Sequence, residues 1–118
     1  MESTKNYSRE KLSQMMDGNQ NEVNELMTIF IKMAPIMLED MLNHMKNDNW
    51  PECGNIAHKL KSSTSLWDIH ILDEDILFVE EHGLKSEHTN EISEKINRIN
   101  QILKTVIEQM TEEIASAQ

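Results

Sequence analysis

The sequence predicts an all-α protein: an antiparallel four-helix bundle with a short additional helix at its N-terminal end. Two observations support this fold class. The 118 residues include only three glycines, two prolines, two tryptophans, two phenylalanines and one tyrosine, which is poor material for a turn-rich β fold. Apolar residues recur at steps of three and four along nearly the whole chain, as they do on the buried face of a helix. Short connections between these stretches favour helices that lie antiparallel to their neighbours.

The first two helices are expected within the N-terminal part of the chain. A short helix over residues 8–16 has Ser8 as its N-cap and Gly18 just after its end. A long apolar stripe then runs over residues 21–46. Pro35 interrupts this stripe, so we expect the second helix to be kinked or split in two at that point.

Three more helices are expected after the turn "KNDNWP". The third has Asn49 as its cap and Pro51 in its first turn, where proline is tolerated. Asp68 is expected to cap the fourth, which continues until Gly83 stops it. Thr89 opens a long last helix. Most of the nine methionines lie on the apolar stripes and are interpreted as core residues.

Length, charge and cysteine count limit the classes of function. The chain is expected to form one domain over residues 1–118, with a core over about 8–115. A formal charge of −10 argues against nucleic acid or an anionic membrane as a partner. No apolar run approaches the roughly 20 residues that span a bilayer, and the first residues lack an apolar signal core. The single Cys53 cannot form an internal disulfide or a zinc site by itself. We therefore expect a reduced, cytoplasmic protein. It is also expected to be a monomer.

His58 is the candidate functional residue of the third helix. At 100° per residue it lies about 200° from both Ile56 and Leu60, so it is expected to point away from the core. Its neighbours on that face, at positions −4, +3, +4 and +7, are Gly54, Lys61, Ser62 and Ser65. Three of these four are small, and one is a cation a single helical turn away.

This arrangement suits a phosphoryl group on the imidazole. Near pH 7 much of an exposed imidazole is neutral, and the neutral ring is a nucleophile that needs no general base. Lys61 would compensate the charge of the phosphoryl group from the same face. The spacing alone leaves open the alternative that His58 is an exposed histidine without a function.

Other chemistries find less support in the sequence. No glutamate stands three residues before any of the five histidines, and no His-x-x-x-His or Cys-x-x-Cys spacing occurs, so no metal site is expected. Cys53 lies about 140° around the helix from His58, which argues against a Cys–His nucleophile pair. Phosphate-binding glycine loops are absent, so ATP is not an expected substrate.

The stretch "AHKLKSS", residues 57–63, resembles the signature of histidine-containing phosphotransfer (HPt) domains, typically Ala-His-x-Leu-Lys-Gly-Ser. The flanking stretches "FIKMAPIML" (30–38), "NDNW" (47–50) and "ILDEDILFVEEHG" (71–83) are similar to the family's neighbouring elements, so the resemblance covers most of residues 8–110. Two positions depart from the pattern: Ser62 replaces the usual glycine, and Asp68 stands where a glycine is common.

The resemblance implies a phosphocarrier of two-component phosphorelays, without catalytic activity of its own. His58 would accept the phosphoryl group through Nε2, Lys61 would stabilise it, and Lys59 would help to dock the partner. Gly54, Ser62 and Ser65 are further candidates for docking. The implied partners are response-regulator receiver domains or a hybrid histidine kinase; the receiver brings Mg²⁺, and the chain needs no cofactor of its own. The alternative is a helical adaptor that binds such a partner through the same face without phosphoryl transfer.

Overall fold

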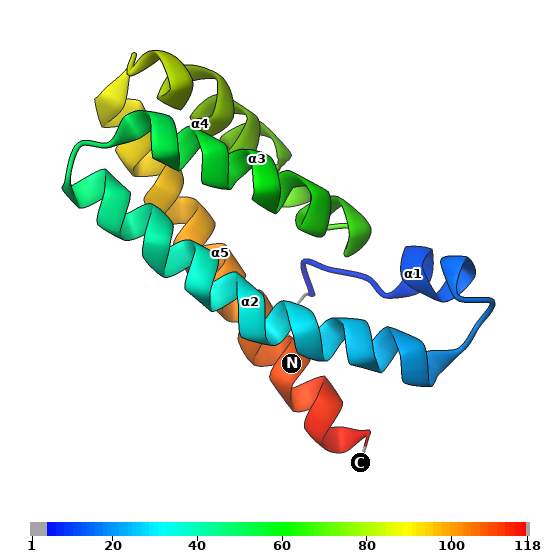
Figure 1. Ribbon diagram of the computed structural model, residues 1–118. Helices are drawn as coiled ribbons and strands as arrows, with labels where there is room; N and C mark the ends of the chain where they lie inside the picture. The colour runs from blue at the N-terminus through cyan, green and yellow to red at the C-terminus, as the bar shows by residue number, and fades with distance from the viewer. Residues whose placement is uncertain (1–4, 118) are drawn as a thin grey trace.

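A computed structural model describes residues 5–117 and shows an all-helical protein, with no strand among those residues. Figure 1 shows its elements, which are α1 (Glu10–Met15), α2 (Gln20–Lys46), α3 (Trp50–Leu66), the single 3₁₀ turn η1 (His70–Leu72), α4 (Asp73–Lys85) and α5 (Thr89–Ser116). The prediction of an all-α chain is therefore confirmed. Within the described residues, no helix offers an apolar stretch sufficient to cross a bilayer.

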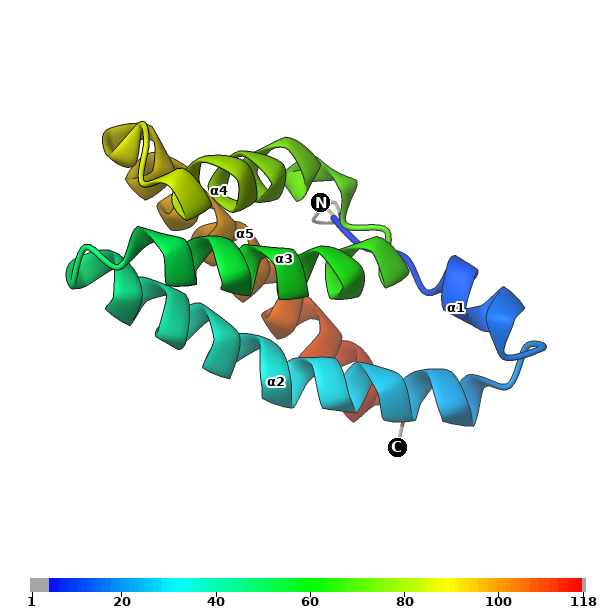
Figure 2. The same ribbon diagram turned by 45° about the horizontal axis from the view of Figure 1, so that its top comes forward.

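Each of the helices α2 to α5 packs against two others (Figures 1 and 2). α3 contacts α2 and α4, and α5 contacts the same two helices. α1 lies beside the first half of α2, near the end of α3. This arrangement leaves one long side of α3 uncovered between α2 and α4, and the candidate site lies there.

The core follows the stripes that the sequence predicts. α5 begins at Thr89, as expected, and its fully buried residues recur at steps of three and four. They are Ile92, Ile96, Ile99, Leu103, Val106 and Met110. At about 25 cal/mol per Å² of apolar area removed from water, such a stripe on each helix is the main source of stability.

α2 is continuous through Pro35, so of the two predicted outcomes, a kink or a split, the split does not occur. A proline inside a helix removes one backbone donor and costs about 3 kcal/mol. Buried residues on both sides of it, including Ala34 and Leu38, keep the helix packed against its neighbours. Burial of these side chains outweighs the loss of one hydrogen bond.

The N-terminal segment is fixed to α5 through Glu113. Its carboxylate accepts hydrogen bonds from the Tyr7 hydroxyl at 2.7 Å and from Arg9 Nη1 at 2.6 Å. Burial acts to raise the pKa of Glu113, but these donors and Lys5 outweigh it and hold the pKa below its ordinary value. Ser8 is not the N-cap of α1; its hydroxyl accepts from the backbone N–H of Glu10, and Arg9 occupies the cap position.

In the described part of the chain, α1, α2, α3 and α4 end in the same backbone motif. In α1, α2 and α3 the residue just beyond the C-cap has a positive φ; these residues are Asp17, Asp48 and Asp68. In α4 the C-cap residue itself, Ser86, has a positive φ. After α3, for example, the Asp68 N–H donates to the Ser65 carbonyl at 3.2 Å and the Ile69 N–H donates to the Thr64 carbonyl at 2.8 Å. This is the Schellman arrangement, which usually has glycine at the left-handed position.

Two predicted helix boundaries are wrong for this reason. Asp68 does not cap the fourth helix but terminates α3, and α4 begins at Asp73 after the 3₁₀ turn. Gly83 does not end α4, which continues to Lys85. A β-carbon at Gly83 would lie 2.8 Å from the carbonyl oxygen of Trp50, so this glycine allows α4 to approach α3 closely.

Candidate functional site

His58 lies on the exposed side of α3, as the sequence predicts. Its side chain is 67% exposed, whereas Ala57 and Leu60 on either side of it are buried. The segment forms a regular helix because Pro51 occupies its first turn and its buried residues recur with helical spacing. The imidazole is therefore held on a rigid element and is accessible to a second protein.

Glu80 of α4 meets His58 across the gap between the two helices. Its carboxylate accepts a hydrogen bond from His58 Nδ1 through one oxygen and from Lys61 Nζ, at 2.9 Å, through the other. The Glu80 side chain is only 14% exposed, although His58 and Lys61 are largely open to solvent. His58, Lys61 and Glu80 thus form one connected group, which we call the His58 triad.

The close approach of α3 and α4 positions Glu80. Gly54 and Gly83 face each other, since a β-carbon on Gly83 would lie 3.0 Å from the Gly54 nitrogen. A β-carbon on Gly54 would in turn lie 3.1 Å from the Glu80 carbonyl oxygen. His58 is one turn beyond Gly54 on α3, and Glu80 is about one turn before Gly83 on α4. The close contact between Gly54 and Gly83 therefore determines the distance that the Glu80 side chain must span to meet His58.

Electrostatics in the triad favour a charged Glu80. The hydrogen bond from Lys61, followed by the one from His58, lowers the pKa of Glu80 below its ordinary value, against a smaller opposing effect of burial. An ionised carboxylate can only accept hydrogen bonds, so the hydrogen in the His58–Glu80 bond belongs to Nδ1. In the neutral ring Nε2 then carries the free lone pair.

This arrangement prepares His58 for nucleophilic attack through Nε2. Attack by a neutral imidazole leaves positive charge on the ring, and the Glu80 carboxylate lies against the nitrogen opposite the one that reacts. Lys61 is half-exposed and one turn away on the same helix, within reach of a group bound to the ring.

Cys53 takes no part in this chemistry. Its thiol is buried and donates to the Met41 carbonyl at 3.6 Å. Burial raises the pKa of the Cys53 thiol to about 11, so the thiolate is scarce near neutral pH. The exclusion of a Cys–His pair is confirmed by this placement.

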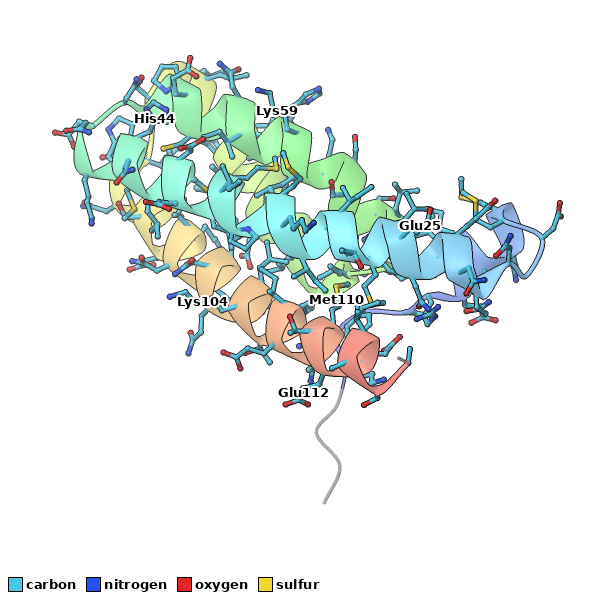
Figure 3. All side chains as sticks on the ribbon, turned by 60° about the horizontal axis from the view of Figure 1, so that its bottom comes forward. Glu25, His44, Lys59, Lys104, Met110 and Glu112 are labelled. Carbon is cyan, nitrogen blue, oxygen red and sulfur yellow. The ribbon has the colours of Figure 1, made fainter. Side chains whose placement is uncertain are left out.

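The four candidate docking residues occupy different surroundings. Lys59 and Ser62 are exposed, and Lys59 projects outward from α3 in Figure 3. Ser65 is half-buried, and Lys11 Nζ approaches its backbone and hydroxyl oxygens at 3.4 and 3.5 Å. Gly54 is buried against α4, so its assignment as a docking residue is wrong; it acts on helix spacing.

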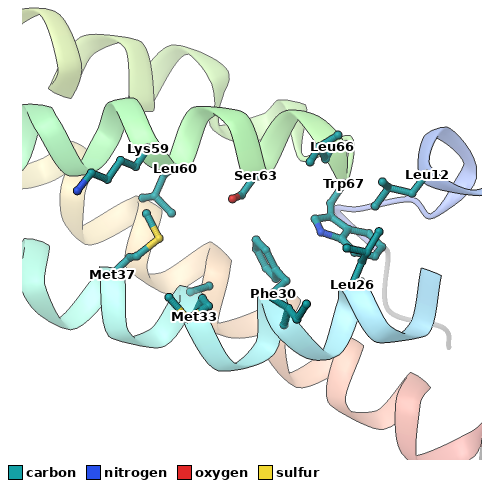
Figure 4. Close-up of a pocket in the computed structure, with 12 residues that line it drawn as sticks. Leu12, Leu26, Phe30, Met33, Met37, Lys59, Leu60, Ser63, Leu66 and Trp67 are labelled. Carbon is teal, nitrogen blue, oxygen red and sulfur yellow. The ribbon is translucent and has the colours of Figure 1, made fainter. Parts of the chain in front are cut away.

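An apolar groove of about 410 Å³ runs between α2 and α3 (Figure 4), and Lys59, the residue after His58, is part of its lining. Lys59, Leu60 and Trp67 line it from α3, and Phe30 and Met33 line it from α2. The side chain of Met33 is 50% exposed, although most methionines were expected in the core. The groove thus gives α3 an apolar surface towards α2, whereas the His58 triad lies between α3 and α4.

Glu80 is not among the site residues that the sequence predicts. The signal available was its position beside Val79, which belongs to the buried stripe of α4. A carboxylate next to a buried position lies at a helix interface more readily than in open solvent. Its partner, 22 positions earlier in the chain, depends on tertiary packing and leaves no local pattern.

In comparisons with known proteins, no family model, no curated protein and no solved structure matched the chain. The function is therefore inferred from the residues of the site and from their geometry.

Proposed function

We propose that this protein is a histidine phosphotransfer protein, a phosphocarrier whose acceptor is Nε2 of His58. The observation that carries the proposal is the His58 triad: an exposed imidazole whose Nδ1 donates to a carboxylate shared with a lysine. In this proposal α2 to α5 correspond to the antiparallel four-helix bundle of HPt domains, and the protein acts as a cytoplasmic monomer.

The proposed step is an in-line transfer from a receiver phospho-aspartate. The Nε2 lone pair of His58 attacks phosphorus, an N–P bond forms, and the P–O bond to the aspartyl carboxyl breaks with its electron pair on the carboxylate oxygen. The ring, protonated at Nδ1 and phosphorylated at Nε2, is stabilised by Glu80. Lys61 turns towards the phosphoryl oxygens, and the receiver supplies the Mg²⁺ that its own aspartate chemistry uses. Transfer to a second receiver reverses these steps.

The apolar groove supports docking of a receiver on this face. It lies between α2 and α3, and its lining includes the exposed apolar side chains of Ile29 and Met33. Lys59 borders the same groove and offers a cation to an acidic partner. Ser62, with a side chain larger than the usual glycine but still small, keeps the approach to His58 open and adds a hydroxyl near the phosphoryl position.

The direct test is a transfer assay with Mg²⁺ and a panel of prephosphorylated receiver domains, followed by intact mass. Wild type should gain one acid-labile, base-stable phosphoryl group, and His58→Gln should gain none. His70→Gln is the matched control, because His70 is similarly exposed at 62% but lies outside the triad. Helicity and melting of His58→Gln should stay close to wild type, because the replaced side chain is exposed. Normal phosphorylation of His58→Gln would refute the assignment.

A second candidate is a helical adaptor that docks a receiver without phosphoryl transfer. The apolar groove favours it as much as it favours the carrier, since docking alone needs no imidazole. Receiver binding that is unchanged in His58→Gln, together with no phosphorylation of wild type by any receiver, would support the adaptor. If Met33→Asp, in which His58 is intact, no longer binds a receiver, the receiver docks on the groove whether the protein is a carrier or an adaptor.

A further inference from the structure

We propose a second site, a binding site for a divalent transition-metal ion of the zinc class, at the turn between α4 and α5. His82, Glu87 and His88 each offer one ligand atom there, and these atoms all lie within 4.8 Å of one another. The three residues are distinct from those of the His58 triad, and this proposal does not depend on phosphoryl transfer.

The backbone turn at the end of α4 brings His82 and Glu87 together. The Ser86 N–H donates to the Gly83 carbonyl and the Glu87 N–H donates to the His82 carbonyl, both at 3.0 Å, with Ser86 at φ 54°. In this Schellman arrangement the side chains at the Glu87 and His82 positions are neighbours, and an apolar contact is usual there. Here the pair consists of a carboxylate and an imidazole.

His88, the N-cap residue of α5, completes the cluster. Its own φ of 54° turns the chain sharply, and its ring stands edge-on to His82, with centroids 4.8 Å apart and planes at 84°. The Phe78 ring packs against the His82 ring, with their centroids 4.3 Å apart, and limits the movement of His82. Two imidazoles and one carboxylate therefore converge on one side of the turn.

The Nδ1 atom of His82 gives independent evidence for a ligand. This atom is buried and has no hydrogen-bond partner among residues 5–117, and the Glu87 Oε2 atom lies 3.9 Å away, beyond hydrogen-bond range. Buried polar atoms are normally paired, so an unpaired ring nitrogen facing a carboxylate requires an explanation. A bound cation would satisfy both groups.

The geometry fits zinc after a small closure. Bonds of about 2.0–2.2 Å to nitrogen and oxygen place tetrahedral ligand atoms about 3.3 Å apart, so the widest separation must shorten by about 1.5 Å. The side chains of Glu87 and His88 are each 54% exposed, so both can make this movement. His88 Nδ1 lies 3.7 Å from Glu91 Oε1, which can accept its N–H when Nε2 binds the metal. Two imidazoles favour zinc over magnesium or calcium, and water would take the fourth position.

The test is calorimetric titration of the EDTA-treated full chain with ZnCl₂, with melting curves as a second readout. Wild type should bind one Zn²⁺ per chain and melt at a higher temperature with it. His88→Gln and Glu87→Gln should each weaken binding by at least about tenfold and reduce the thermal shift. Both residues are exposed, so these variants are expected to fold, whereas His82 packs on Phe78 and is a less suitable target.

Two control variants make the result decisive. His70→Gln removes an exposed histidine whose carboxylate neighbours, Asp68 and Asp73, bond to opposite ring nitrogens, and it should bind Zn²⁺ like wild type. His58→Gln should also bind Zn²⁺ like wild type, because His58 is not one of the three proposed ligands. The proposal is overturned if wild type binds no Zn²⁺, if His88→Gln and Glu87→Gln bind as tightly as wild type, or if a control variant loses binding equally.

Discussion

Glu80→Gln is the substitution that best separates an oriented imidazole from a merely exposed one. The amide keeps the size and position of the carboxylate but loses its charge, and it no longer forces the hydrogen in the His58 bond onto Nδ1. His58 itself and the surrounding helices are unchanged. The variant therefore tests the role of Glu80 in orientation and charge, with the nucleophile still present.

The size of the effect follows from the contacts of Glu80. A hydrogen bond to a charged group contributes about 1.5–3 kcal/mol and a neutral one about 1, and His58 is 67% exposed, so the lower end applies. The expected loss of stabilisation is then about 0.5 kcal/mol as the ring becomes positive, or about a twofold slower phosphorylation. In a buried triad the same substitution would remove far more stabilisation, since water would not screen the charges.

The assay uses phosphoramidate, a small N-phosphoryl donor, so that the result does not depend on the identity of the partner. Nε2 attacks phosphorus, the P–N bond of the donor breaks, and ammonia leaves. The rate of phosphoryl incorporation is followed by intact mass for wild type, Glu80→Gln and Glu81→Gln. Glu81 is an exposed neighbour, so its substitution changes the net charge equally without touching the triad.

The reasoning predicts that Glu80→Gln is slowed and that Glu81→Gln matches wild type. Equal rates for all three proteins would show that Glu80 does not prepare His58 for attack. Equal slowing of both variants would indicate a general charge effect and would likewise refute the role assigned to Glu80.

Three further predictions concern the triad, the helix crossing and the N-terminal segment. Lys61→Ala should shorten the lifetime of phosphohistidine or slow transfer without unfolding the protein; an unaltered lifetime and rate would remove Lys61 from the mechanism. Gly83→Ala should lower the free energy of unfolding in urea by about 1–2 kcal/mol. The new β-carbon would lie 2.8 Å from the Trp50 carbonyl oxygen, and this clash costs more than the roughly 1 kcal/mol of helix propensity that alanine regains. Unchanged stability would contradict the close approach of α3 and α4. The pKa of Glu113 lies below its ordinary value of 4.5, so its contribution to stability is present above that pH and is lost as the pH falls through the lowered pKa. Urea unfolding of wild type and Glu113→Gln should therefore differ at pH 7, and the difference should disappear as the pH falls below the lowered pKa. A difference that persists in acid would exclude the ion pair with Arg9 as its source.

Local periodicity was sufficient to predict the helices and the exposed side of α3. The positions that share a face are fixed by 3.6 residues per turn, so the placement of His58 opposite Leu60 did not require knowledge of the other helices. The beginning of α5 at Thr89 was likewise predictable from the sequence that follows it.

The helix ends and the partner of His58 were not predictable in the same way. Gly54 and Gly83 carry the ordinary signals for turns, yet both lie inside helices where the backbones approach closely. Asp68 carries the signal for a helix start but takes the left-handed position that ends α3. Glu80 reaches His58 only because those glycines bring α3 and α4 together, and a contact between distant segments leaves no periodic trace in the sequence.

The central claim is that Nε2 of His58 accepts the phosphoryl group while Nδ1 keeps its hydrogen towards Glu80. Phosphorylated, ¹⁵N-histidine-labelled protein tests it directly, because NMR of the ring nitrogens identifies both the residue and the nitrogen bonded to phosphorus. We predict one phosphorylated ring, that of His58, with coupling to ³¹P at Nε2. Phosphorus on Nδ1 of His58, or on another histidine, would contradict the account.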